Sequence, residues 1–217
     1  MSYQLVGYPL CPFVQRVLIT LNLKNADYEL TWLDPHGELP DWFKDWSPLG
    51  KVPVMKVPTG EVLFESMAIV EFIEEQENTP SIFAKEGAQR AFNRAWAGVA
   101  GELYGPQYMS MRAKSEEEVK EHFAALKGTL AILEDECGTT FFAGDQFSVV
   151  DIVLAPMFAR FALVTSLGAE DVLASFPKLT ALSDKLLAHP AVAKTMEGEW
   201  KSHFIENMKK NGGILFQ

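Results

Sequence analysis

Basic charge is scarce in this 217-residue chain, where 19 Lys and Arg residues stand against 29 Asp and Glu residues, giving a net charge of −10. Such an acidic chain repels phosphate backbones and anionic membranes, so we expect no nucleic-acid partner. No apolar run approaches the roughly 20 residues that cross a bilayer, and no N-terminal basic patch precedes an apolar core. These absences predict a cytoplasmic protein that does not insert into membranes.

Cysteine is scarce as well, since Cys11 and Cys137 are the only two. They lie in different predicted segments, and a chain without a secretion signal usually keeps its thiols reduced. The four histidines show no ligand spacing and no Gly-rich phosphate loop occurs, so we predict no metal. The apolar content of 48% is ample for a packed core, and the length suits one large domain or two small ones.

Cys11 lies between an apolar segment that is typical of a strand and a helical pattern that begins with Pro12. Proline is tolerated in the first turn of a helix, which places Cys11 at or just before a helix N-terminus. Cysteines in such positions have pKa values of roughly 3.5 to 7.5 instead of about 8.5, and the thiolate is the nucleophile. The alternative is that Cys11 is only a small buried hydrophobe. Val14 occupies the place of a second C-x-x-C cysteine, so we expect monothiol exchange, or attack by a second thiol that Cys11 helps to bind.

Strand and helix patterns alternate along the first 77 residues, whereas every periodic segment from residue 87 onward is helical. Residues 77–81 are polar, contain proline and break the pattern, and residues 78–86 are predicted as a linker. The expected elements of the first part are strand 3–7, a helix to 23, strand 26–34, a short helix 41–46, a hairpin of strands 52–57 and 62–64, and a helix 67–76 capped by Ser66. The expected helices of the second part are 89–111, 115–137, 149–167, 178–187 and a short piece from 190. Ser148 and Asp151 form a predicted capping box, which is a folding signal and not a catalytic one.

Three motifs carry a resemblance to a known family. They are Cys-Pro-Phe-x-x-Arg at residues 11–16, Lys51-Val52-Pro53, and Glu65-Ser66. With the Ser148–Asp151 box, they resemble the cytosolic glutathione transferases, and the cysteine resembles the omega and lambda classes and the dehydroascorbate reductases. The resemblance implies a thioredoxin-like α/β N-terminal domain over 1–77 that binds glutathione, an all-α domain over 87–217, and a homodimer.

The resemblance also implies the roles of individual residues. Cys11 is the expected catalytic residue, and the expected glutathione-binding residues are Phe13, Lys51, Val52, Pro53, Glu65 and Ser66. In the family the Val-Pro bond is cis and the valine backbone pairs with glutathione, while the Glu-Ser pair takes the γ-glutamyl group. A trans Pro53, a solvated Lys51 and a Ser66 that only caps its helix remain as alternatives.

The chain departs from the omega pattern at Leu39, where that class carries a lysine for glutathione, so Lys51 is expected to hold the glycyl carboxylate. Arg16 is expected to have a structural or interface role. The acceptor site is expected between the domains, lined by Tyr8, Leu10, Phe13 and one or more of Trp96, Tyr104 and Tyr108. The tail 200–217 either covers this site or packs on the outside.

The predicted function is that of a glutathione-dependent thiol transferase or reductase, in which Cys11 forms a mixed disulfide with glutathione. Glutathione is the expected co-substrate, and dehydroascorbate or a glutathione mixed disulfide is the expected acceptor. Two alternatives remain open. The chain either conjugates glutathione to electrophiles, or it is a non-enzymatic adaptor with this fold.

Overall fold

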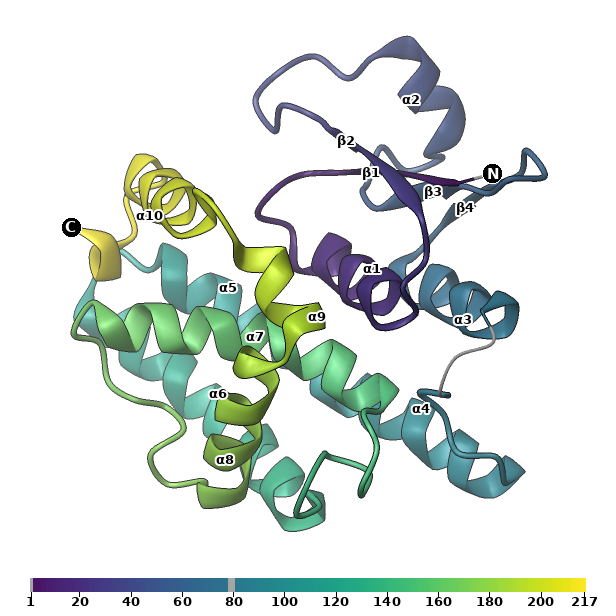
Figure 1. Ribbon diagram of the computed structural model, residues 1–217. Helices are drawn as coiled ribbons and strands as arrows, with labels where there is room; N and C mark the ends of the chain where they lie inside the picture. Colours follow the sequence, from purple (N-terminus) through teal and green to yellow (C-terminus); the bar gives the residue numbers. More distant parts are fainter. Residues whose placement is uncertain (1, 78–80) are drawn as a thin grey trace. The chain divides into compact units, whose positions relative to one another are not determined.

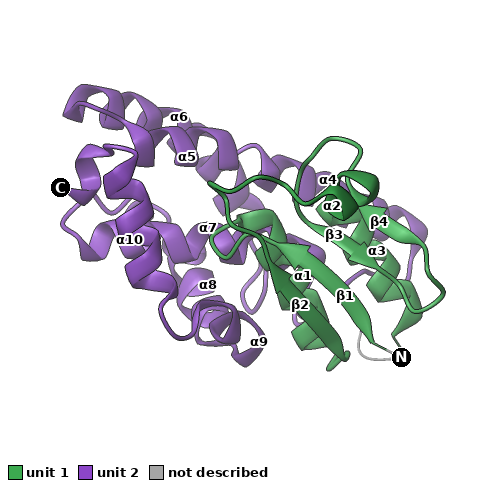
Figure 2. Cartoon of the chain, turned by 90° about the horizontal axis from the view of Figure 1, so that it is seen from above, with its two compact units in different colours: residues 1–80 green, residues 81–217 purple. Residues whose placement is uncertain are grey.

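The computed structural model describes residues 2–77 and 81–217 (Figure 1). The chain divides into two compact units, residues 1–80 and 81–217 (Figure 2). Residues 78–80 of the predicted linker lie outside the described residues, and residues 81–86 belong to the second unit.

Unit 1 is built on a four-stranded sheet with the order β2-β1-β3-β4. The strands are β1 (Tyr3–Gly7), β2 (Tyr28–Trp32), β3 (Val54–Lys56) and β4 (Val62–Phe64). β1 is parallel to β2, with Tyr3 opposite Tyr28, and antiparallel to β3, with Val6 opposite Val54. β3 and β4 form the predicted hairpin, with Met55 opposite Leu63. The first two strands are parallel because helix α1 (Pro12–Leu23) supplies the crossover between them.

Helices cover both faces of this sheet (Figure 1). α1 and α3 (Ser66–Gln76) pack together on one face, and α2 (Asp41–Trp46) lies on the other. Side chains of neighbouring residues in a strand point to opposite faces of the sheet. Leu5 and Val6, which are both buried, therefore pack on opposite faces. Val6 packs with Phe43 of α2 and with Val54. The predicted strands 26–34 and 52–57 are longer than observed, and the second begins only after Pro53, which has no N–H for a ladder.

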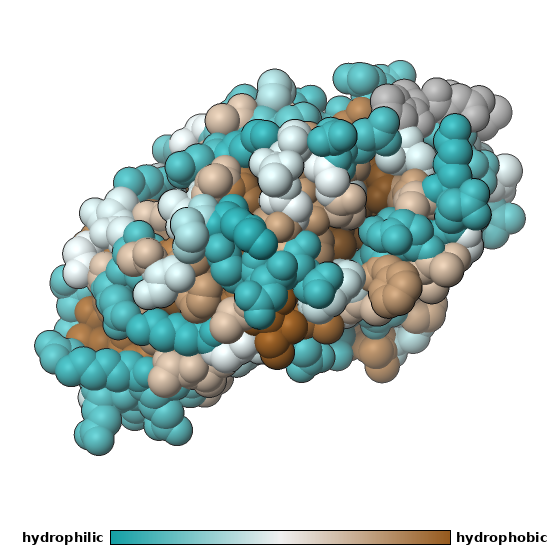
Figure 3. Space-filling view, turned by 90° about the horizontal axis from the view of Figure 1, so that it is seen from below, coloured by the Kyte–Doolittle hydropathy of each residue, from teal (hydrophilic) through white to brown (hydrophobic). Residues whose placement is uncertain are grey.

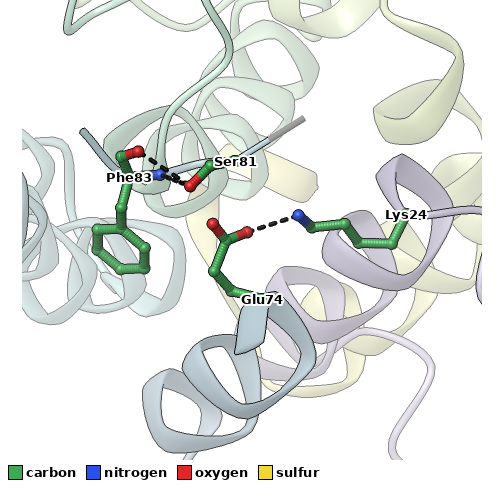
Figure 4. A network of polar contacts seen from close by, with 4 residues as sticks. All are labelled: Lys24, Glu74, Ser81 and Phe83. Atoms are coloured by element: carbon green, nitrogen blue, oxygen red, sulfur yellow. Dashed lines mark hydrogen bonds and ion pairs between the residues drawn. The ribbon is translucent and has the colours of Figure 1, made fainter. Parts of the chain in front are cut away.

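A buried ion pair joins the two helices on that face (Figure 4). The Lys24 ammonium lies 2.5 Å from a Glu74 carboxylate oxygen, and their side chains are 1% and 6% exposed. Lys24 is the C-cap of α1, where a cation also interacts favourably with the helix dipole. The pair joins the C-terminal ends of α1 and α3 and so stabilises the packing of these two helices, which contacts along their length also hold together.

Unit 2 is helical. Its α-helices are α4 (Gly87–Gly101), α5 (Tyr104–Arg112), α6 (Glu116–Glu136), α7 (Val149–Ser166), α8 (Pro177–Ala188), α9 (Pro190–Ala193) and α10 (Trp200–Lys210). Short 3-10 turns follow at Lys194–Met196 and Ile214–Phe216. A single helix over 89–111 was wrong, because the chain breaks between α4 and α5. Pro106 explains the break, since proline has no N–H to donate in a helix interior and fits only the first turn of α5.

α7 is the central helix of unit 2 and packs on α4 and α8. It is long and apolar enough to cross a membrane by length and composition, but 83% of it is buried inside the protein, as is typical of a core helix. The predicted capping box at its start is confirmed. The Asp151 carboxylate accepts hydrogen bonds from Ser148 N–H at 2.7 Å, Ser148 Oγ at 2.6 Å and Phe142 N–H at 3.0 Å. Its role is therefore to anchor the loop before α7.

Candidate active site

Cys11 is the N-cap residue of α1, and Pro12 occupies the first helical position, as the sequence predicts. The Cys11 N–H donates to the Tyr8 carbonyl oxygen at 3.1 Å, which holds the turn between β1 and α1. The side chain of an N-cap residue is placed to accept from the N–H groups of the second and third helical residues, here Phe13 and Val14. The Cys11 side chain is partly exposed and is not part of a disulfide. The positive end of a helix dipole favours a thiolate over a thiol, so we expect a nucleophilic sulfur at this position.

A pocket of about 170 Å³ lies within unit 1 and brings together the six residues predicted to bind glutathione. These residues are Phe13, Lys51, Val52, Pro53, Glu65 and Ser66. They come from the N-terminal turns of α1 and α3 and from the loop before β3. The pocket is thus lined by one cation, one carboxylate, a helix N-terminus and an aromatic ring. This combination suits a small peptide that carries both positive and negative charges.

The start of α3 differs from the prediction. Ser66 is the first helical residue and Glu65 is the N-cap, so Ser66 as the capping residue was wrong. Glu65 has φ 65° and ψ 113°, a backbone conformation that residues other than glycine rarely adopt. Such residues cost roughly 1–3 kcal/mol and cluster at functional sites. The strained turn brings the Glu65 carboxylate and the positive end of α3 to the same pocket wall.

The loop before β3 forms another wall. The Val52-Pro53 peptide bond is cis, which confirms the expectation for this motif. The buried Ser47 hydroxyl holds the loop in place, because it donates to the Lys51 carbonyl oxygen at 2.8 Å and accepts from the Lys51 N–H at 2.8 Å. Lys51 itself is exposed, so its ammonium can reach an anionic group at the mouth of the pocket.

The sequence reasoning missed four residues that line the pocket: Ser47, Pro48, Leu49 and Phe64. Ser-Pro next to Leu-Gly is a turn signal, and it directly precedes the Lys51 motif. That signal places the segment in a loop, but only the fold brings the loop next to the N-terminus of α3.

The side chains expected at an acceptor site have roles inside unit 2. Tyr104 is buried, and its hydroxyl donates to the Val153 carbonyl oxygen at 2.7 Å. The Trp96 ring lies 6.0 Å from the Phe142 ring, whereas Tyr108 is 47% exposed and accepts a hydrogen bond from Arg112. In the tail, Phe216 packs on Phe204. The acceptor site between the domains stays a prediction.

Metal-ligating side chains do not gather in either unit. Across residues 2–77 and 81–217, no group of three or more His, Cys, Asp or Glu side chains could hold a metal ion. Asp151 is a buried acid, and burial raises its pKa to about 6 against the lowering effect of its hydrogen bonds. Asp151 serves the capping box described above.

Comparison with known proteins identifies the class to which this fold and pocket belong. Residues 10–76 match the family model described as glutathione S-transferase, N-terminal domain, and residues 116–185 match the model for the C-terminal domain. The chain therefore belongs to the glutathione S-transferase family, and the predicted resemblance and fold class are confirmed. Members of this family use glutathione as co-substrate.

The chain is similar to individual members that come from several classes of this family. It is 35% identical over 149 residues to glutathione S-transferase DHAR2 of Arabidopsis thaliana, an alignment that covers 67% of this chain and 64%, less than two thirds, of that protein. It is 30% identical over 189 residues to glutathione S-transferase L3 of the same plant, covering 85% and 78%. The solved structure of glutathione transferase Omega 3C from Trametes versicolor is similar with a TM-score of 0.83 at 28% identity, covering 97% of this chain and 91% of that one.

Proposed function

We propose that this chain is a glutathione-dependent thiol transferase that reduces mixed disulfides, and small oxidised molecules such as dehydroascorbate, through Cys11. The observation that carries the proposal is Cys11 as the N-cap of α1, with Phe13 of the same helix turn lining the pocket of Lys51, Val52, Glu65 and Ser66. A tyrosine or serine at this position binds the glutathione thiol, but only a cysteine can also form a covalent bond to it.

With a glutathione mixed disulfide as the acceptor, the reaction is two successive thiol-disulfide exchanges. The Cys11 thiolate attacks the glutathionyl sulfur of a mixed disulfide, a Cys11-glutathione disulfide forms, and the acceptor leaves as a thiolate that takes up a proton. A second glutathione thiolate attacks the glutathionyl sulfur of this disulfide, oxidised glutathione leaves and the Cys11 thiolate is regenerated. A low pKa suits both steps, because Cys11 is the nucleophile in the first and the leaving group in the second. Dehydroascorbate instead takes its two electrons from two glutathione molecules, which leave as one molecule of oxidised glutathione.

The pocket residues position glutathione for both exchanges. The free amides and dipole at the N-terminus of α3 suit the γ-glutamyl carboxylate, and Glu65 supplies the countercharge for the ammonium. The Val52 backbone pairs with the cysteinyl unit, and Lys51 attracts the glycyl carboxylate. These contacts use every ionic group of the tripeptide.

The test is Cys11→Ser, which should abolish reduction of a glutathione mixed disulfide and of dehydroascorbate while leaving glutathione binding largely in place. A hydroxyl cannot form the disulfide intermediate. Activity is measured with both acceptors at saturating glutathione, and binding by calorimetry. Full reductase activity in Cys11→Ser would refute the mechanism.

Conjugation of glutathione to electrophiles is the second enzymatic candidate, and the family supports it because its members are transferases. Strong conjugation by the wild type without disulfide exchange would favour it over the reductase. If the protein is instead an adaptor without enzymatic activity, we expect that it is not retained on immobilised glutathione and does not bind free glutathione at millimolar concentration. The cytoplasmic location stays a prediction.

A further inference from the structure

Arg16 is a buried cation behind the pocket, one turn into α1. It is 5% exposed, and it is not among the residues that line the pocket. A buried charge needs partners, and among the partners of Arg16 are residues on different walls of the pocket. Its guanidinium carbon lies 4.8 Å from the centre of the Phe13 ring, and its Nη1 donates to the Ser66 hydroxyl at 3.4 Å.

The direction of the contact with Ser66 has a chemical consequence. Arginine has N–H donors and no acceptor, so the Ser66 oxygen must accept. The hydroxyl hydrogen then remains available to an acceptor on the pocket side. At 3.4 Å this hydrogen bond is long, so the main effect of Arg16 on Ser66 is electrostatic. The positive charge of the guanidinium favours an orientation of the Ser66 hydroxyl in which the hydrogen points away from Arg16.

We propose that Arg16 is a positioning residue for glutathione, which makes Ser66 a hydrogen-bond donor to the γ-glutamyl carboxylate and adds positive charge behind it. This inference rests on the proposed function, because the carboxylate is that of bound glutathione. Arg16 does not touch the ligand. It acts through Ser66 and through the Phe13 ring, and so it also connects the helix turn of Cys11 to the helix turn that receives the carboxylate.

The test compares two ligands whose sizes match. One is glutathione, and the other is its analogue with a carboxamide in place of the γ-glutamyl α-carboxylate. Arg16→Met keeps an unbranched side chain in the buried site and removes the charge. We expect its dissociation constant for glutathione to rise about tenfold by calorimetry, and its dissociation constant for the carboxamide to change by less than twofold. A merely structural role would weaken both ligands alike.

Two further variants keep the test decisive if Arg16→Met does not fold. Arg16→Lys retains the charge but not the planar donor group, so we expect a rise of about threefold, again for glutathione alone. In the background of Ser66→Ala, the Arg16→Lys change should lose most of its effect, because the hydroxyl that it acts on is gone. Equal effects in both backgrounds, or equal effects on both ligands, would overturn the inference.

The proposed function and this inference fail in different ways. If wild-type protein does not bind glutathione, or if Cys11→Ser remains a full reductase, the proposed function is wrong. If the wild type binds glutathione and discriminates against the carboxamide, but the Arg16 variants bind both ligands as the wild type does, only the role of Arg16 is wrong.

Discussion

At the scale of single residues, the pocket is lined by side chains of opposite charge, which attract oppositely charged ends of a ligand. Lys51 and Glu65 are both exposed, and they reach the pocket from separate segments of the chain. Phe13 contributes an aromatic wall that is 40% exposed. Under the proposed function, the ammonium of glutathione would lie near Glu65 and its glycyl carboxylate near Lys51.

Lys51→Ala should raise the dissociation constant for glutathione about tenfold, because a hydrogen bond to a charged group contributes roughly 1.5–3 kcal/mol and Lys51 is solvated, which favours the lower end. The rate of Cys11 alkylation should stay nearly unchanged. Calorimetry measures the affinity. Lys44→Ala is the matched control, since Lys44 is exposed, pairs with Asp41 and does not line the pocket. Equal affinity of Lys51→Ala and wild type would assign Lys51 to the solvated surface.

The sequence predicts Cys11 at the start of α1 and the capping box because each depends on a local pattern. A proline directly after a cysteine indicates a helix start. A serine three residues before an aspartate indicates a capping box. Both patterns span only a few residues. The cis Pro53 was expected only from the family resemblance. The positive φ of Glu65 could not be predicted, because glutamate has no preference for it and tertiary packing imposes it. The contact of Arg16 with Ser66 joins residues 50 positions apart, so it depends on how α1 and α3 pack.

At the scale of elements, the start of α7 decides how the loop 142–148 is held. Asp151 is fully buried, and burial raises its pKa from 3.8 to about 6. The folded chain therefore holds this proton more tightly than the unfolded chain does. The stabilisation that comes from the raised pKa of Asp151 is therefore fully present below about pH 4, and it is lost as the pH rises through about 6.

Asp151→Asn should destabilise the protein, because an amide cannot accept from Ser148 and Phe142 as the carboxyl group does. It should also remove the titration. The gap in free energy of unfolding between wild type and variant is expected to narrow as the pH rises from 4 to 6, by at most about 1.4 kcal/mol per pH unit. Urea unfolding at several pH values measures the gap. A gap that stays constant with pH would contradict this assignment.

At the scale of the whole molecule, apolar side chains interrupt the acidic surface. Figure 3 shows hydrophobic residues between hydrophilic ones on the face in view. Phe64 and Phe92 are 45% and 58% exposed, and Met67 is partly exposed. Because exposed apolar residues are common at interfaces, and because the family resemblance implies a dimer, a homodimer remains our prediction.

Light scattering should give a mass near twice the 24.2 kDa of one chain at micromolar concentration. Phe92→Asp should shift the mass toward the monomer, because a charge would be buried in the interface. Ile132→Asp is the control, as Ile132 is 53% exposed on α6 and is not among the residues assigned to the proposed interface. A wild-type mass near 24 kDa would exclude the dimer under these conditions.

The two cysteines sit at opposite ends of helices, Cys11 as the N-cap of α1 and Cys137 as the C-cap of α6. Burial raises the pKa of Cys137 to about 11, and the negative charges of Glu134 and Asp151 add to this effect. The Cys137 thiol is therefore unreactive near neutral pH. The native protein should therefore take up one iodoacetamide or maleimide group per chain at pH 7, located at Cys11 by peptide mass spectrometry, and a second only after unfolding. A fluorophore or spin label can then be attached beside the pocket of the wild-type chain without removing any cysteine.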